Sequence, residues 1–238
     1  MIIYNTAYTI FKNNIQIGHL IGSLHFGMSP IDYKKIQDKF EPLLKDCKEV
    51  YFEAKLPHYS SLTAGVEKAL LSHLNEIDNG IKINYFESTS FQYAMLNSRV
   101  WFGEKIINLP WKKYSLLKKY PVLINVISKI VARFFKVYNV VYNFTHYDSH
   151  TQAVQAEALR EQSRFLELYQ NYMKNISTSF TADEQQAYLM KDRDQDFANI
   201  ILSHQHSGYI YMVGTAHIPN IVKILEHHGL TLKPWDLM

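Results

Sequence analysis

Cysteine is almost absent from this chain, which has one residue of this type, Cys47, among 238. A single thiol excludes an internal disulfide framework and any cysteine-rich zinc module. Cys47 lies between Asp46 and Lys48, without the local sequence signature of a catalytic nucleophile. We therefore expect a buried, unreactive thiol and a protein of a reducing compartment.

Long apolar runs are also lacking. A helix that spans a bilayer needs about 18 or more uncharged apolar residues in a row. The most apolar window, 120–144, is interrupted by Lys129, Arg133 and Lys136. Residues 1–14 show no basic segment followed by an apolar core and a cleavage site, which is the pattern of a signal peptide. These two absences predict a soluble, cytoplasmic protein.

Three common catalytic signatures are missing as well. The chain has no Gly-x-x-x-x-Gly-Lys phosphate loop, no Gly-x-Ser-x-Gly nucleophile elbow and no His-Glu-x-x-His helix. Nucleotide-binding enzymes and serine hydrolases therefore find no support in the sequence. The formal net charge is only +3, which is too small to indicate a nucleic-acid-binding protein.

Acidic residues are scarce in one part of the chain. Residues 99–136 contain nine Lys or Arg but a single acid, Glu104. A basic segment that also carries apolar residues is typical of a contact with a membrane surface or an acidic partner, which we expect for residues 99–144. The alternative is a solvated helix face whose charge is balanced by acids elsewhere.

What the chain does contain is ample material for a packed core, since 47% of its residues are hydrophobic and 14% are aromatic. Strand-like and helix-like segments alternate near both ends, whereas helical patterns dominate the middle. We expect an α/β fold with a mixed central sheet flanked by helices, formed by residues 1–98 and 179–238. A helical insertion or lid would occupy about 99–178, within a single domain that covers residues 1–238.

Turn and cap residues set the expected limits of the elements. The Asn13-Asn14 pair suits a hairpin turn because Asn tolerates positive φ, and Gly229 suits a helix end. Thr181 and Glu184 have the spacing of a capping box. The predicted elements are a hairpin of strands 4–9 and 15–24, a helix from Ser29-Pro30 to about residue 44, a strand at 49–54, a helix at 60–77, a strand at 81–86, a helix at 181–204, a strand at 209–214, a helix at 217–228 and an edge strand at 231–235.

Two Gly-x-x-His tetrads are the main functional signal. Residues 22–25 and 214–217 each close an apolar run that is typical of a buried strand, so His25 and His217 are expected at strand ends. In α/β sheets, ligands bind in the crevice beyond the carboxyl ends of the strands. Because His is the commonest metal ligand, two His at that edge predict a shared metal or catalytic site. The alternative is that each is an ordinary surface or core residue.

Glu53 is the third candidate for this site. It lies in the predicted strand 49–54, which is too apolar to face solvent on either side. A buried carboxylate must be paired, hydrogen-bonded or bound to a metal. Two His and one carboxylate form the usual ligand set of a catalytic divalent ion, with a position left for water. The structural alternative is that Glu53 forms an ion pair with a buried Arg.

Three further charged residues are candidates for the chemistry. Arg193 and Asp194 fall within the apolar stripe of the predicted helix 181–204 and are expected to point inward. A buried guanidinium there suits a substrate carboxylate or an oxyanion, and a helix-to-sheet salt bridge is the alternative. Glu87, at another strand end, is a candidate general base, or else an acid that the helix dipole favours at a helix start.

Four segments of the chain together carry a family resemblance. They are Leu-Ile-Gly-Ser-Leu-His-Phe-Gly at 20–27, Val-Tyr-Phe-Glu-Ala at 50–54, Arg-Asp-x-x-Phe-Ala at 193–198, and Val-Gly-Thr-Ala-His-Ile-Pro at 213–219 with a closing His-Gly-Leu. The set resembles the TraB/GumN family, which includes the TIKI metalloproteases. The similarity covers residues 1–87 and 181–238. Asp194 departs from the family pattern, which more often has Asn there.

The resemblance implies an α/β fold shared with the erythromycin-esterase-like and ChaN-like proteins. It matches His25 and His217 to the two family histidines, Glu53 to the glutamate and Arg193 to the arginine, with Glu87 as a looser match. It implies metal-dependent hydrolysis of a peptide or protein substrate. The alternative is a non-catalytic protein that binds a peptide, or haem, in the same crevice. A ligand set of two His and one carboxylate suits Mn²⁺ or Zn²⁺ and does not choose between them.

Overall fold

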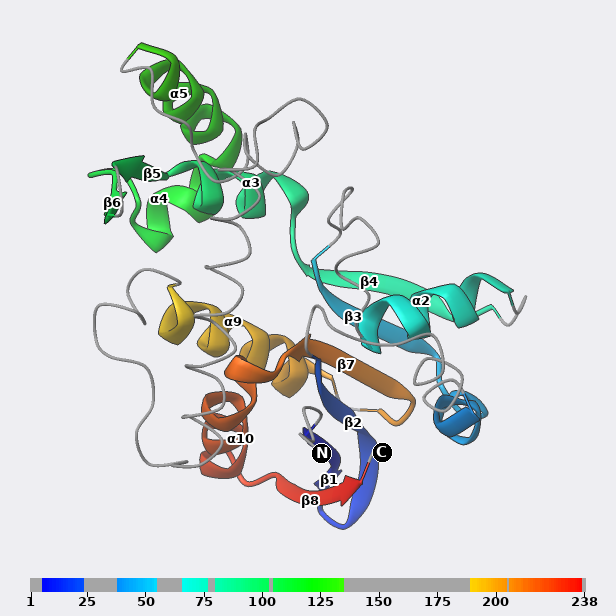
Figure 1. Cartoon of the computed structure of the whole chain (residues 1–238). Coiled ribbons are helices and arrows are strands. Elements are labelled where there is room, and N and C mark those ends of the chain that lie inside the picture. Colours follow the sequence, from blue (N-terminus) through cyan, green and yellow to red (C-terminus); the bar gives the residue numbers. More distant parts are fainter. Residues whose placement is uncertain are drawn as a thin grey trace. The chain divides into compact units, whose positions relative to one another are not determined.

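The structure, a computed structural model, describes residues 6–23, 38–54, 66–76, 80–102, 105–134, 189–204 and 206–236. The chain forms two compact units. Met1–Phe86 and Lys191–Met238 make the first unit, and Glu87–Met190 make the second. The helices and strands carry the labels shown in Figure 1.

A six-stranded sheet is the centre of the first unit, with the strand order β4-β3-β7-β2-β1-β8. β7 pairs in parallel with β2 and with β3, whereas β1 pairs antiparallel with β2 and with β8. The predicted α/β fold with a mixed central sheet is thereby confirmed. The strands are β1 (Thr6–Lys12), β2 (Ile15–Ser23), β3 (Glu49–Ala54), β4 (Lys82–Glu87), β7 (Tyr209–Gly214) and β8 (Thr231–Asp236).

The first two strands form the predicted hairpin. Asn13 and Asn14 adopt φ angles of 51° and 63° at the turn, a left-handed conformation that Asn tolerates better than most residues. β1 runs past the predicted end at Thr9, because residues 10–12 stay paired with β2 across a bulge. The hairpin thereby sets the position of β2, whose last residue is Ser23.

Helices cover both faces of the sheet. The helical segment 38–44 and α2 (Val66–Glu76) pack on one face. α9 (Met190–Ser203) and α10 (Ile218–His227) pack on the other. The helices contribute Phe40, Leu44, Leu70 and Leu74 to the first buried layer, and Phe197, Ala198, Ile201, Ile218, Ile221 and Leu225 to the second.

Alternation along β3 decides which way Glu53 points. Successive side chains of a strand face opposite sides of the sheet. Val50 and Phe52 belong to the buried layer beneath α2, whereas Tyr51 packs against the layer beneath α9 and α10. Glu53 follows Tyr51 in this alternation, so its carboxylate is directed to the α9 side of the sheet.

The second unit contains three described helices and one small hairpin. The helices are α3 (Thr89–Asn97), α4 (Tyr114–Lys119) and α5 (Pro121–Phe134). A shared core holds them together through Phe91, Ala94, Met95, Leu117, Ile124 and Leu189. The indole Nε1 of Trp111 donates a 2.9 Å hydrogen bond to the hydroxyl oxygen of Ser128 and so ties the start of α4 to α5.

The start of the predicted helical insertion, residues 99–178, is corrected by the structure. Two short strands, β5 (Arg99–Phe102) and β6 (Lys105–Asn108), pair antiparallel there. Both strands are rich in β-branched or aromatic residues, which suit a pleated sheet, but each is too short to show a clear period. Most of the predicted lid, residues 135–178, lies outside the described residues.

The helix predicted at 181–204 is also shorter than expected within the described residues. Leu189 has a φ of 53°, and a left-handed residue cannot continue a right-handed helix. α9 therefore starts at Met190. The predicted capping box of Thr181 and Glu184 lies outside the described residues.

Cys47 is expected to react slowly with thiol reagents in the folded protein. Its half-buried thiol donates a 3.5 Å hydrogen bond to the carbonyl oxygen of Glu49, and burial raises the pKa of Cys47 to about 11. Because the thiolate is the reactive form, labelling at pH 8 should be roughly two orders of magnitude slower than for a free cysteine. Labelling of native and urea-unfolded protein with a disulfide reagent measures this ratio. Equal rates in both states would contradict the prediction.

Candidate functional site

Three parallel strands deliver their carboxyl ends to one edge of the sheet. β7 lies between β2 and β3. In the register of β2 with β7, Gly22 is opposite Val213 and Ser23 is opposite Gly214. The two Gly-x-x-His tetrads therefore start at the ends of neighbouring strands; the sequence predicts the strand ends but not that the strands are neighbours. His25, in the first tetrad, lies outside the described residues.

Glu53 is held at this edge by two donors. Its Oε2 accepts a 2.7 Å hydrogen bond from the backbone N–H of Gly214, and its Oε1 accepts one from Nη2 of Arg193. Both side chains are buried, with Glu53 7% and Arg193 4% exposed. The pair joins β3 to α9 across the sheet surface. Glu53 thus has the Arg partner that the structural alternative requires.

His217 lies in a 3₁₀ turn, Thr215–His217, between β7 and α10. Its Nδ1 donates to Oδ1 of Asp194, and its Nε2 lies 3.7 Å from Oε1 of Glu53. Asp194 also accepts a 2.8 Å hydrogen bond from Nδ2 of Asn220 on α10. The imidazole is therefore fixed by Asp194 on one side and faces Glu53 on the other.

The Glu53 cluster, which we define as Glu53, Arg193, Asp194 and His217, balances its charges within a buried space. Burial and the charge of Arg193 lower the pKa of His217, but the carboxylates of Asp194 and Glu53 outweigh them and raise it to about 9. In the absence of a metal, His217 is therefore an imidazolium at neutral pH. Two carboxylates then face two cations, which explains how four charged groups are tolerated in the interior.

Arg193 packs against an aromatic ring on its own helix. Its guanidinium carbon lies 5.5 Å from the centroid of the Phe197 ring, one helical turn further along α9. The same ring meets His217 edge-on, with centroids 5.2 Å apart. Arg193 and Asp194 are both buried, which confirms that they point inward from the apolar stripe. Phe197 therefore packs against both cations of the Glu53 cluster.

The cluster offers two groups that suit a metal ion. Metal–ligand bonds of about 2.1 Å allow one ion to join Nε2 of His217 to Oε1 of Glu53 across the observed 3.7 Å. The bond from Nδ1 of His217 to Asp194 is the arrangement that orients metal-bound histidines. Among the residues that the structure describes, no group of three or more His, Cys, Asp or Glu is placed to hold a metal. The third predicted ligand, His25, is not among the described residues.

Glu87 belongs to the second unit, of which it is the first residue. It ends β4 and accepts a hydrogen bond from the side-chain amide of Gln92 on α3. Ser88 caps α3, because its hydroxyl oxygen accepts a 3.1 Å hydrogen bond from the backbone N–H of Phe91. The position of Glu87 just before α3 agrees with the alternative of an acid at a helix start. Its role as a general base stays a prediction.

Three contacts of the cluster were not predicted. No sequence pattern indicates a role for Asn220, for the N–H of Gly214, or for Asp194 as the partner of His217. A signal for Asp194 was present, because it follows Arg193 on the buried stripe and an inward carboxylate needs a donor. The partner itself depends on the 3₁₀ turn before α10, which sets the direction of the His217 ring.

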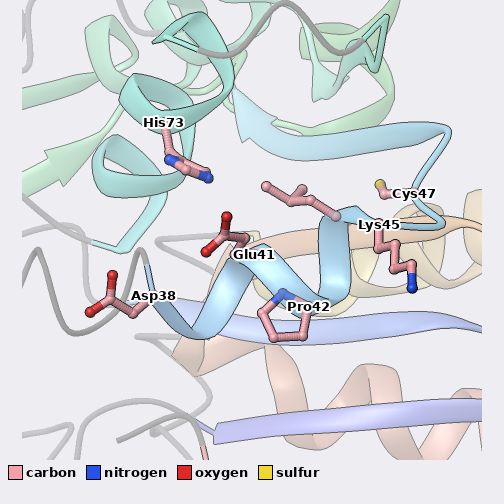
Figure 2. A pocket seen from close by; sticks show the side chains of 7 residues that line it. Asp38, Glu41, Pro42, Lys45, Cys47 and His73 are labelled. Carbon is pink, nitrogen blue, oxygen red and sulfur yellow. The ribbon is translucent and has the colours of Figure 1, made fainter.

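A hollow of about 680 Å³ lies elsewhere in the first unit, on the side covered by 38–44 and α2. In Figure 2 the carboxylate of Glu41 and the ring of His73 point toward one another across it. The hollow is lined by Asp38, Glu41, Pro42, Leu44, Lys45, Cys47 and His73. None of these belongs to the Glu53 cluster, which lies on the opposite face of the sheet.

Comparisons with protein-family models, with curated protein sequences and with solved structures give no match.

Proposed function

We propose that the chain is a metal-dependent hydrolase, of the peptidase type, whose divalent ion is held by His25, Glu53 and His217. The observation that carries the proposal is the placement of Nε2 of His217, 3.7 Å from Oε1 of Glu53, while Asp194 holds Nδ1. The resemblance of four sequence segments to the TraB/GumN family, which is itself part of the proposal, points to the same activity. The nitrogen and oxygen donors suit either Mn²⁺ or Zn²⁺.

The protein's own contribution is orientation. Asp194 fixes the tautomer and direction of the His217 ring, and the N–H of Gly214 holds one oxygen of Glu53. Loss of the Nε2 proton of His217 would free that atom to act as a ligand. The ion would supply Lewis-acid polarisation of water and of the substrate carbonyl. The burial of the cluster keeps bulk water from screening these charges.

We assign to Arg193 the role of a substrate-binding cation. Its contact with Glu53 uses Nη2, and a guanidinium carries five N–H donors in a rigid plane. A substrate carboxylate, or the oxyanion that develops during hydrolysis, is the group that such a fork stabilises. Because Arg193 is packed against Phe197, it would meet the substrate already oriented.

Arg193→Lys is expected to lower hydrolysis by about 10²-fold while metal content stays near that of the natural chain, since the charge is kept and the planar fork is lost. The assay is cleavage of a fluorogenic peptide library by chelator-stripped protein after addition of Mn²⁺, Co²⁺ or Zn²⁺. Arg133→Lys, at an exposed position of α5, is the matched control and should not change the rate. Equal rates for both variants would remove Arg193 from the chemistry, and no metal-stimulated cleavage would contradict the function.

The alternative function is a non-catalytic protein that binds a peptide, or haem, through the same edge of the sheet. One observation favours it, since both oxygens of Glu53 already accept hydrogen bonds and the cluster is neutral without a metal. Haem titration separates the two functions. A Soret shift that His217→Ala abolishes, together with no metal-stimulated cleavage, would support the binding protein over the enzyme.

A further inference from the structure

α5 exposes an apolar face although it belongs to a packed unit. Its inner side carries Ile124, which lies in the core with α3 and α4, and Ser128, which accepts the hydrogen bond from Trp111. Its outer side consists of large side chains that are between 38% and 63% exposed, namely Val122, Leu123, Val126, Ile127 and Ile130. At about 100° per residue these five fall within an arc of roughly 140°. The helix therefore presents one continuous apolar stripe outward.

Basic residues accompany this stripe. Lys129 is exposed about 20° outside the arc, and Arg133 is exposed within it in the last turn of α5. Lys118 and Lys119 are exposed on the preceding helix, α4. No Asp or Glu occurs between Lys105 and Tyr147 in the sequence. An amphipathic helix with an apolar face and flanking Lys or Arg is the type that lies in the headgroup region of a membrane. No described helix is both long and apolar enough to cross a bilayer.

We propose that the outer face of α5 binds the surface of a lipid bilayer that contains anionic lipids. The apolar stripe enters the boundary between headgroups and acyl chains, and the basic residues beside it contact the anionic headgroups. The helix has 14 residues, which corresponds to about 21 Å along the membrane plane. This surface uses no residue of the Glu53 cluster, so the proposal does not depend on the proposed function.

Charge distinguishes this occupant from a second copy of the chain. If two copies met through the stripe, Lys129 and Arg133 of each would approach those of the other. The segment offers no acid to pair with them, because none lies between Lys105 and Tyr147. Like charges brought together in an interface disfavour the complex. An anionic bilayer supplies both the apolar phase and the opposite charge.

The test is flotation of the full chain with two kinds of vesicle, phosphatidylcholine alone and phosphatidylcholine with about one third phosphatidylglycerol. We expect binding to the anionic vesicles that weakens as salt is raised. Leu123→Glu/Ile130→Glu should abolish flotation, because it places two charges at the centre of the stripe. Lys129→Gln/Arg133→Gln should weaken it by about 30-fold. Ile15→Glu, at an exposed apolar position in the hairpin of the first unit, is the matched control and should float normally.

Several results would overturn the proposal. One is no flotation with anionic vesicles at low salt, and another is equal binding to both kinds of vesicle. A third is a dimer in light scattering that Leu123→Glu/Ile130→Glu dissociates, with no vesicle binding, because the occupant would then be a second copy. The substituted side chains are exposed, so each variant should keep the far-ultraviolet circular dichroism and melting temperature of the natural chain. Equal loss of flotation in Ile15→Glu would also reject the assignment to α5.

Discussion

Glu53→Gln is expected to lower the free energy of unfolding by about 3 to 5 kcal/mol, because it leaves the charge of Arg193 buried without its partner. The side chains of Glu53 and Arg193 are only 10% and 5% exposed, so solvent cannot replace the lost carboxylate. The Gln amide can still accept the hydrogen bond from Gly214, but it carries no charge. Urea denaturation in the presence of a chelator measures the difference without any contribution from a bound ion.

The matched control is Glu49→Gln, the same chemical change at the other end of β3. Glu49 accepts a 2.6 Å hydrogen bond from Asn84 and pairs at 3.4 Å with Lys82, whose side chain is 66% exposed. An exposed ion pair contributes at most about 1 kcal/mol, so this variant should lose little stability. If both variants lost a similar free energy of unfolding, the buried pair of Glu53 and Arg193 would not be a main source of stability.

His217→Ala should reduce the affinity for Mn²⁺ or Zn²⁺ by more than roughly 10²-fold, because it removes a direct ligand, whereas Asp194→Asn should reduce it by about 10-fold to 100-fold. Asp194 acts through the His217 ring, so the Asn side chain keeps an acceptor but loses the charge that supports ligation. Isothermal titration of chelator-stripped protein measures both affinities.

His227→Ala is the control for this comparison. His227 ends α10, the helix that follows the turn of His217, and its ring is solvent-exposed beside His228. Its loss should leave the metal affinity unchanged. If His217→Ala bound the ion as tightly as the natural chain, His217 would not be a metal ligand. Its imidazole would then have only a structural role, in the ion pairs with Asp194 and Glu53.

Local patterns in the sequence were sufficient to predict the strands and the helix that position the residues of the Glu53 cluster. β3 and β7 have the limits that their apolar runs predict, Glu49–Ala54 and Tyr209–Gly214. The inward direction of Arg193 followed from helical spacing, and the burial of Glu53 from the apolar strand around it. These features depend only on near neighbours in the chain and on burial, so a single sequence contains them.

The features that the sequence did not predict depend on contacts between distant residues or on backbone conformations that composition does not reveal. Asp194 and His217 are 23 positions apart and meet only after α9 and α10 pack on the same face of the sheet. Leu189 is left-handed although the residue type disfavours this conformation. The hairpin of β5 and β6 has strands of four residues, which show too little alternation to be separated from a helix.

Binding of a divalent ion through His217 and Glu53 is measured directly by titrating the chelator-stripped natural chain with Zn²⁺ and with Mn²⁺. We expect the chain to bind one equivalent of at least one of these ions. We also expect a rise in melting temperature, since a ligand at about 100 times its dissociation constant stabilises the folded state by roughly 2.7 kcal/mol. No binding heat and no thermal shift with either ion at millimolar concentration would contradict metal binding by these residues.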